Sequence, residues 1–103
     1  MKNTIKSHRD FNFEGEKSIS TPAFIMKYRK KLRETGEYGL VVSKKIFPHA
    51  VQRNRAKRML REWLRGCVPP NDFDILLIAR TEILQTPMPT GARQMKAIVK
   101  KIK

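Results

Sequence analysis

The residues best suited to binding chemistry are gathered in one short stretch of this 103-residue chain. Residues 53–65 read Arg-Asn-Arg-Ala-Lys-Arg-Met-Leu-Arg-Glu-Trp-Leu-Arg. In a helix, at 100° per residue, most of the cations fall within about 140° of one another, and the apolar residues gather opposite them. The cationic side would hold Arg53, Asn54, Lys57, Arg58, Arg61 and Arg65, with Arg55 and Glu62 at its flanks. The apolar side would hold Ala56, Met59, Leu60, Trp63 and Leu64.

Phosphate binding is the chemistry that this pattern favours. Burying the large apolar side chains at roughly 1.5–3 kcal/mol each would hold the charged side rigid. The competing interpretation is a solvated basic face, which any charged helix can present. Five arginines in the stretch favour phosphate binding. Guanidinium groups contact phosphate in a bidentate manner, whereas lysine and glutamate serve solubility equally well.

Self-contained catalysis is not indicated anywhere in the chain. His8, His49 and Cys67 have no partners at metal-ligand or catalytic spacing. There is no glycine-rich phosphate loop of nucleotide-binding spacing. The short acidic pairs are Glu14 with Glu16 and Asp72 with Asp74. A two-metal nuclease would need a carboxylate cluster, so the sequence predicts no catalytic residue and no metal held tightly by the protein.

The charge balance identifies the class of partner. The chain has 23 Lys and Arg against 9 Asp and Glu, which gives a net charge of +14. Such a field attracts polyanions, with nucleic acid as the first candidate and an anionic membrane surface as the second. A hydrophobic content of 40% suffices for one modest core, so we expect a single domain over residues 1–103.

The chain carries no recognisable targeting or membrane signal. The lone Cys67 forms no internal disulfide, which fits a reducing compartment. The first residues lack the apolar stretch of a signal peptide. No apolar run approaches the ~18 residues of a spanning helix. We therefore expect a cytoplasmic protein.

Hydrophobic patterning predicts alternating strands and helices around the basic stretch. The expected elements are a short helix or extended segment at 8–14, strands at 22–29, 38–43 and 74–79, and helices at 50–65 and 91–102. The run at 74–79 is continuously apolar, which is typical of a strand buried on both faces. Gly66 is placed as the C′ cap of the basic helix. The order predicts an α+β sandwich with helices over one sheet.

Two of these segments together resemble the protein subunit of bacterial ribonuclease P. They are residues 39–45, Gly-Leu-Val-Val-Ser-Lys-Lys, and residues 50–62, Ala-Val-Gln-Arg-Asn-Arg-Ala-Lys-Arg-Met-Leu-Arg-Glu. The family's Asp-x-x-x-x-x-Ala-Arg strand is matched by residues 74–80, and its early Asp-Phe pair by Asp10 and Phe11. The similarity runs from about residue 8 into the final helix.

The resemblance implies a fold and an activity. The fold is a single-domain α/β sandwich in the order α-β-β-β-α-β-α, shared with a domain of a small-subunit ribosomal protein, with residues 1–7 expected to be flexible. Its β-α-β crossover is left-handed, whereas general topology rules favour the right hand. The implied partners are a catalytic RNA and precursor tRNA, whose 5′ leader the particle removes by endonucleolytic hydrolysis. Magnesium is held mainly by the RNA, and no DNA, membrane or obligate protein partner is expected.

The resemblance also assigns residues to two RNA-binding surfaces. Residues facing the catalytic RNA would be Arg53, Asn54, Arg55, Lys57, Arg58, Arg61 and Arg65, with Lys44 and Lys45 at the preceding strand end. A cleft for the single-stranded leader would be lined by Phe11, Phe13, Phe24 and Tyr28, the last two as core or cleft wall. Bases stacked on such rings gain about 1–3 kcal/mol with little sequence preference.

Three positions depart from the family pattern. Phe11 and Phe13 are two residues apart, whereas the family spaces its pair by four. Lys27 stands where the family often has a cleft tyrosine, and Tyr28 comes one place later. Strand alternation then points Tyr28 away from the side of Lys27 unless a bulge intervenes. Residues 46–49 also replace a glycine-containing turn.

Other functions remain as alternatives. A ribosome-associated protein or general RNA chaperone would share the sandwich and have no role in tRNA processing. A helix-turn-helix DNA-binding protein is disfavoured because strands, and no short helix, flank the basic helix. A membrane-surface peptide is disfavoured by the two clear strand segments.

Overall fold

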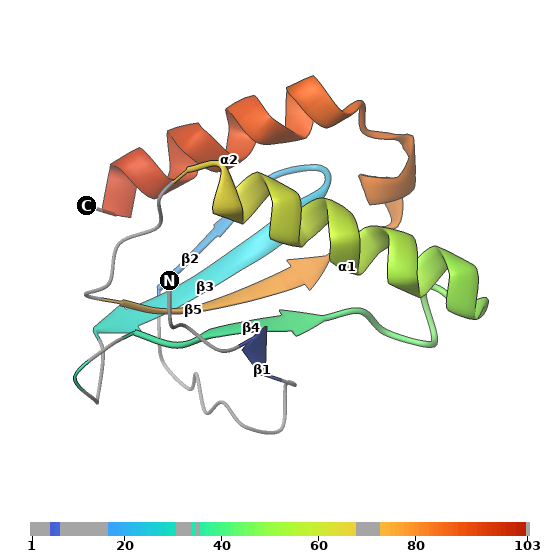
Figure 1. The fold of residues 1–103 in the computed structure, drawn as a ribbon, viewed down its shortest axis with the longest axis horizontal. Helices are drawn as coiled ribbons and strands as arrows, with labels where there is room; N and C mark the ends of the chain where they lie inside the picture. The colour runs from blue at the N-terminus through green and yellow to red at the C-terminus, as the bar shows by residue number, and fades with distance from the viewer. Residues whose placement is uncertain (1–4, 7–16, 31–33, 35, 68–72, 103) are drawn as a thin grey trace.

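Two helices cover one face of a five-stranded sheet (Figure 1) in the computed structural model, which describes residues 5–6, 17–30, 34, 36–67 and 73–102. The elements in chain order are β1 (Ile5–Lys6), β2 (Lys17–Ser20), β3 (Phe24–Lys30), β4 (Tyr38–Val41), α1 (Ala50–Arg65), β5 (Phe73–Ala79), the 3₁₀ helix η2 (Thr81–Gln85) and α2 (Met88–Ile102). The strands lie in the order β1-β4-β5-β3-β2. This is the predicted α+β sandwich.

The central strand is β5, which has neighbours on both sides. It pairs in parallel with β4 and antiparallel with β3, and α1 makes the connection from β4 to β5. Ile75, Leu76 and Leu77 are at most 1% exposed. Because successive side chains of a strand point to opposite faces, their burial confirms that β5 is covered on both faces, as its continuous apolar run predicts.

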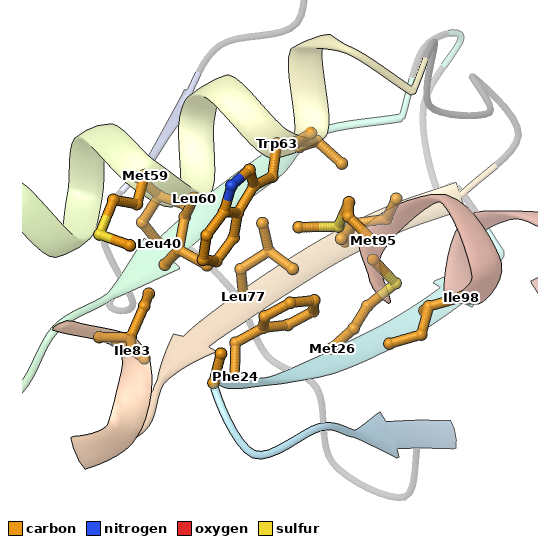
Figure 2. Close-up of a cluster of buried hydrophobic side chains, with 14 of the residues drawn as sticks. Phe24, Met26, Leu40, Met59, Leu60, Trp63, Leu77, Ile83, Met95 and Ile98 are labelled. Atoms are coloured by element: carbon orange, nitrogen blue, oxygen red, sulfur yellow. The ribbon is translucent and has the colours of Figure 1, made fainter. Parts of the chain in front are cut away.

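The register between β3 and β5 is unbroken from Phe24 opposite Ala79 to Lys30 opposite Phe73. Alternation along β3 therefore puts Phe24, Met26 and Tyr28 on one face and Lys27 on the other. Phe24 and Met26 are fully buried in the core, so theirs is the face that the helices cover (Figure 2). Tyr28 accordingly points away from the side of Lys27.

The helix α1 spans the predicted residues 50–65. Pro48 precedes it, and His49 has the extended backbone of an N-cap position, with φ −92° and ψ 133°. Gly66 ends the helix, but its φ of −71° is right-handed. Gly66 is thus the C-cap, one position before the predicted C′, and its N–H donates to the Glu62 carbonyl in an ordinary helical bond of 3.1 Å.

The core lies between the sheet and the two helices (Figure 2). Trp63 of α1 stacks at a tilt on Phe24 of β3, with ring centroids 6.0 Å apart. Gly91 of α2 lies against the same indole, and a Cβ at that position would overlap the Trp63 ring. The absence of a side chain at Gly91 is therefore what allows α2 to pack this closely on α1.

Some elements differ from the sequence prediction. The helix α2 begins at Met88, earlier than the predicted residue 91, because Pro89 lies in the first turn, where no amide hydrogen bond is lost. Hydrophobic patterning did not predict the short β1 and β2 or the 3₁₀ helix η2, although the order implied by the family resemblance has three strands before the basic helix. The helix expected at residues 8–14 lies outside the described residues. Of the stretch expected to be flexible, Ile5–Lys6 form β1.

Candidate nucleic-acid interface

The solvent side of α1 forms a ridge of polar and cationic side chains. We define the α1 basic ridge as Asn54, Arg55, Lys57, Arg58, Arg61 and Arg65. All but Lys57 are exposed, and Lys57 is half-buried. The opposite side of the helix is anchored in the core by residues that are at most 5% exposed, namely Ala56, Met59, Leu60, Trp63 and Leu64. The predicted two-sided helix is thus observed, with its charged side facing solvent.

The ridge borders a shallow surface groove of about 610 Å³. The lining residues are Val51, Asn54, Arg55, Lys57, Arg58 and Arg61. Val51, at the start of the helix, is 79% exposed and adds apolar surface to the groove. Among the residues that the structure describes, no carboxylate forms a salt bridge with a cation of the ridge. The guanidinium groups are therefore available to phosphate oxygens.

Arg53 differs from its neighbours on α1. Its Nη1 donates hydrogen bonds to the carbonyls of Phe47 and Pro48, both at 2.9 Å. Phe47 is 2% exposed and belongs to the core. The Arg53 side chain thus fixes the turn that leads into α1, a positioning contact that comes in addition to any contact with RNA.

Lys44 and Lys45 lie in the exposed turn between β4 and α1. Ser43 holds this turn: its Oγ accepts from the Lys45 N–H at 3.1 Å, and its carbonyl accepts from the Phe47 N–H at 2.8 Å. The first turn of α1 contains no acidic residue and has no side-chain cap. The partial positive charge of the helix N-terminus therefore adds to that of the two lysines.

The residues assigned to a leader cleft have different locations. Phe11 and Phe13 lie outside the described residues. Phe24, predicted as core or cleft wall, is 0% exposed and packs on Trp63, so it belongs to the core. Tyr28 is half-buried at the end of the helix-covered face, where its ring meets Phe73 edge-on at a centroid distance of 5.8 Å. It does not share a face with Lys27, the position at which the family often has its cleft tyrosine.

A partly buried ion pair was not predicted. Asp74 of β5 is 4% exposed, and its Oδ2 accepts from Arg29 Nε at 3.0 Å while its Oδ1 accepts from the Glu37 N–H at 2.9 Å. The carboxylate therefore joins β3, β5 and the residue before β4. The one sequence feature that pointed to this ion pair was an acidic residue, Asp74, at the start of an apolar strand.

Two further findings concern metals and membranes. Within the described residues, no group of three or more His, Cys, Asp or Glu side chains is arranged to hold a metal ion. No helix in the described part of the chain is both long enough and apolar enough to cross a membrane.

A sheet covered by helices and an exposed arginine ridge define a class of small, strongly basic α+β proteins. A sequence profile described as Ribonuclease P matches residues 1–103, and the chain belongs to this family.

Individual relatives agree with this assignment. The ribonuclease P protein component of Legionella pneumophila is 41% identical over 75 residues, which is 73% of this chain and 65% of that protein. The RNase P protein of Thermotoga maritima has a structure with a TM-score of 0.73 at 30% identity, covering 88% of this chain and 87% of that one. The Staphylococcus aureus RNase P protein gives a TM-score of 0.77 at 25% identity, with 96% and 94% covered. These matches confirm the family and the α+β sandwich that the sequence predicts.

Proposed function

We propose that this chain is the protein subunit of a ribonuclease P particle. In this proposal it binds the catalytic RNA and aids the endonucleolytic removal of the 5′ leader from precursor tRNA in the cytoplasm. The observation that carries the proposal is the α1 basic ridge. Its arginines are exposed and without carboxylate partners among the described residues, on a helix whose other side is fully anchored in the core.

The proposed contribution of the ridge is electrostatic. Arginine and lysine side chains replace counterions along the RNA, so that strands carrying many phosphates can approach one another. Because α1 is fixed by its buried side, little backbone freedom is lost when the ridge meets the RNA, and the ordering cost is that of the side chains. Lys44 and Lys45 extend the positive surface at the N-terminal end of the helix.

The chemistry of cleavage is proposed to belong to the RNA. The described residues contain no carboxylate or histidine cluster that fits a magnesium ion. We assign the ligands of magnesium in the particle mainly to the RNA; when bound there, the ion would supply the activation of water for hydrolysis. By offsetting phosphate repulsion, the ridge would let cleavage proceed at a lower magnesium concentration. Phe11 and Phe13 remain the predicted stacking residues for the leader.

Cleavage of precursor tRNA by a bacterial ribonuclease P RNA, at a magnesium concentration too low for the RNA alone, tests this function. Added protein should accelerate cleavage, and the product should carry the mature 5′ end. If the protein binds the RNA without accelerating cleavage, the proposed role in tRNA processing is contradicted. Heat-denatured protein controls for non-specific cationic effects.

A further inference from the structure

A second groove lies away from the ridge, where the end of α2 meets the sheet. It has a volume of about 340 Å³ and contains two aromatic rings and several cations. Its lining consists of Lys17, Tyr28, Arg29, Lys30, Phe73, Lys101 and Ile102. We refer to it as the Tyr28–Phe73 groove. Its volume is at the lower end of the range for small-molecule sites, which suits one nucleotide and not several.

The strand register explains why rings and lysines alternate in this groove. Lys17 of β2 is paired with Tyr28 of β3, and Lys30 of β3 is paired with Phe73 of β5. Directly paired residues point to the same face of a sheet, as do residues two apart along one strand. Two lysines and two aromatic side chains therefore share one small area of the sheet, with Lys101 above it on the last turn of α2.

The rings are partly accessible. Tyr28 and Phe73 are each half-buried, and their planes meet at 78°. In an edge-to-face pair, the edge of one ring covers one face of the other, so the remaining faces are not used by the pair itself. A planar base can therefore stack against the exposed part of either ring.

The charge of the groove is positive. Lys17, Lys30 and Lys101 are exposed, and none of them has an ion pair with another described residue. The guanidinium of Arg29 is bonded to Asp74, whose other oxygen is taken by the Glu37 N–H. None of the residues that line the groove is acidic. Aromatic faces surrounded by unopposed cations are the combination with which proteins hold single-stranded nucleic acid.

We propose that the Tyr28–Phe73 groove binds one nucleotide of a single-stranded RNA. The base stacks on Tyr28 or Phe73, and the flanking phosphates contact Lys17, Lys30 and Lys101. This site lies on the helix-covered face of the sheet, with no residue in common with the α1 basic ridge. The proposed site depends on the proposed function only for the source of the bound RNA, which would be precursor tRNA or the catalytic RNA.

Photocrosslinking of the full chain to a hexauridylate that contains 5-iodouracil tests the proposal without any catalytic RNA. Mass spectrometry should place adducts on Tyr28 or Phe73. Adducts confined to other residues, Phe11 and Phe13 included, would overturn the proposal, as would the absence of adducts. Cleavage of precursor tRNA is measured separately, so a failed crosslink with normal cleavage removes this site and leaves the proposed function in place.

Two triple variants distinguish a local site from general electrostatic attraction. The Lys17→Ala, Lys30→Ala, Lys101→Ala protein should lose at least about fivefold in hexauridylate affinity, as measured from the NMR shifts of groove amides. The matched control is Arg93→Ala, Lys96→Ala, Lys100→Ala, which removes the same charge from exposed positions of α2 outside the groove. Its affinity should change less than about twofold. Equal losses in the two proteins would contradict a defined site.

Tyr28→Leu tests the contribution of the stacking ring. Leucine keeps an apolar side chain against the core, so the fold should persist, as far-UV circular dichroism will show. The affinity of the groove should fall by about fivefold or more. Unchanged affinity in a folded Tyr28→Leu protein would rule out stacking on this ring.

Discussion

Arg53 and Arg58 show that two arginines of one helix can serve different purposes. Arg53 bonds the carbonyls of the turn before α1, whereas Arg58 is exposed and lines the groove along the ridge. Helical spacing places both on the cationic side. It does not reveal that the Phe47 and Pro48 carbonyls lie within reach of Arg53, because that depends on the path of the preceding turn.

Arg53→Lys should lower the free energy of unfolding by about 1–2 kcal/mol, because lysine cannot bridge the two carbonyls with the same planar group. Arg58→Lys is the control and should stay within about 0.5 kcal/mol. Urea unfolding followed by circular dichroism measures both. Equal stability of the two variants would mean that the Arg53 bonds contribute nothing.

Removing the carboxylate of Asp74 should lower the free energy of unfolding by more than Arg53→Lys does. Asp74→Ala removes the carboxylate that accepts from Arg29 Nε and from the Glu37 N–H, and should lower the free energy of unfolding by about 3 kcal/mol. A double-mutant cycle with Arg29→Ala isolates the pair, and a coupling energy of about 1 kcal/mol or more is expected. Strict additivity of the two substitutions would contradict a direct ion pair.

At the scale of the elements, contact between the helices depends on one position. Gly91→Ala places a methyl group on the Trp63 ring and should force α2 away from α1. Overpacking of this kind costs about 1–3 kcal/mol, measurable by urea unfolding. Because the overlap is with the six-membered ring of the indole, Gly91→Ala should cost less when combined with Trp63→Leu. An equal cost in both backgrounds would exclude the indole as the cause.

Most elements could be predicted from the sequence where the hydrophobic pattern agrees with the prolines and glycines at the ends of the element. Pro48, the apolar period and Gly66 together define α1, and the unbroken apolar run defines β5. Hydrophobic patterning missed the strand β2, because Lys-Ser-Ile-Ser carries a single large apolar residue and forms an exposed edge. The start of α2 was missed because two prolines were read as a loop, although proline fits a first helical turn.

The candidate site could be predicted only in part. The α1 basic ridge could be predicted from helical spacing, because burial of the apolar side of the helix leaves the cationic side facing solvent. Phe24 was predicted as core or cleft wall, and strand alternation with Met26 accounts for its place in the core. The ion pair of Asp74 could not be predicted, because it depends on the register between β3 and β5. The left-handed crossover was expected from the family resemblance alone.

At the scale of the whole molecule, the net charge of +14 opposes compaction. Multivalent anions should therefore stabilise the fold, so sulfate at ~10 mM should raise the thermal unfolding midpoint by several degrees. Chloride at equal ionic strength is the control and separates screening from anion binding. A midpoint that sulfate leaves unchanged would show that charge repulsion has little weight in this fold.

The central claim is that the position of the α1 basic ridge, and not net charge alone, makes this chain an RNA partner in tRNA processing. The direct test measures precursor-tRNA cleavage at low magnesium in the presence of two triple variants. One is the ridge variant Arg55→Ala, Arg58→Ala, Arg61→Ala, and the other is the α2 control Arg93→Ala, Lys96→Ala, Lys100→Ala. Both proteins lose three positive charges. We expect the ridge variant to cleave at least about tenfold more slowly than the wild type, and the α2 control to cleave at close to the wild-type rate. Equal rates for the two variants would contradict the assignment of the ridge.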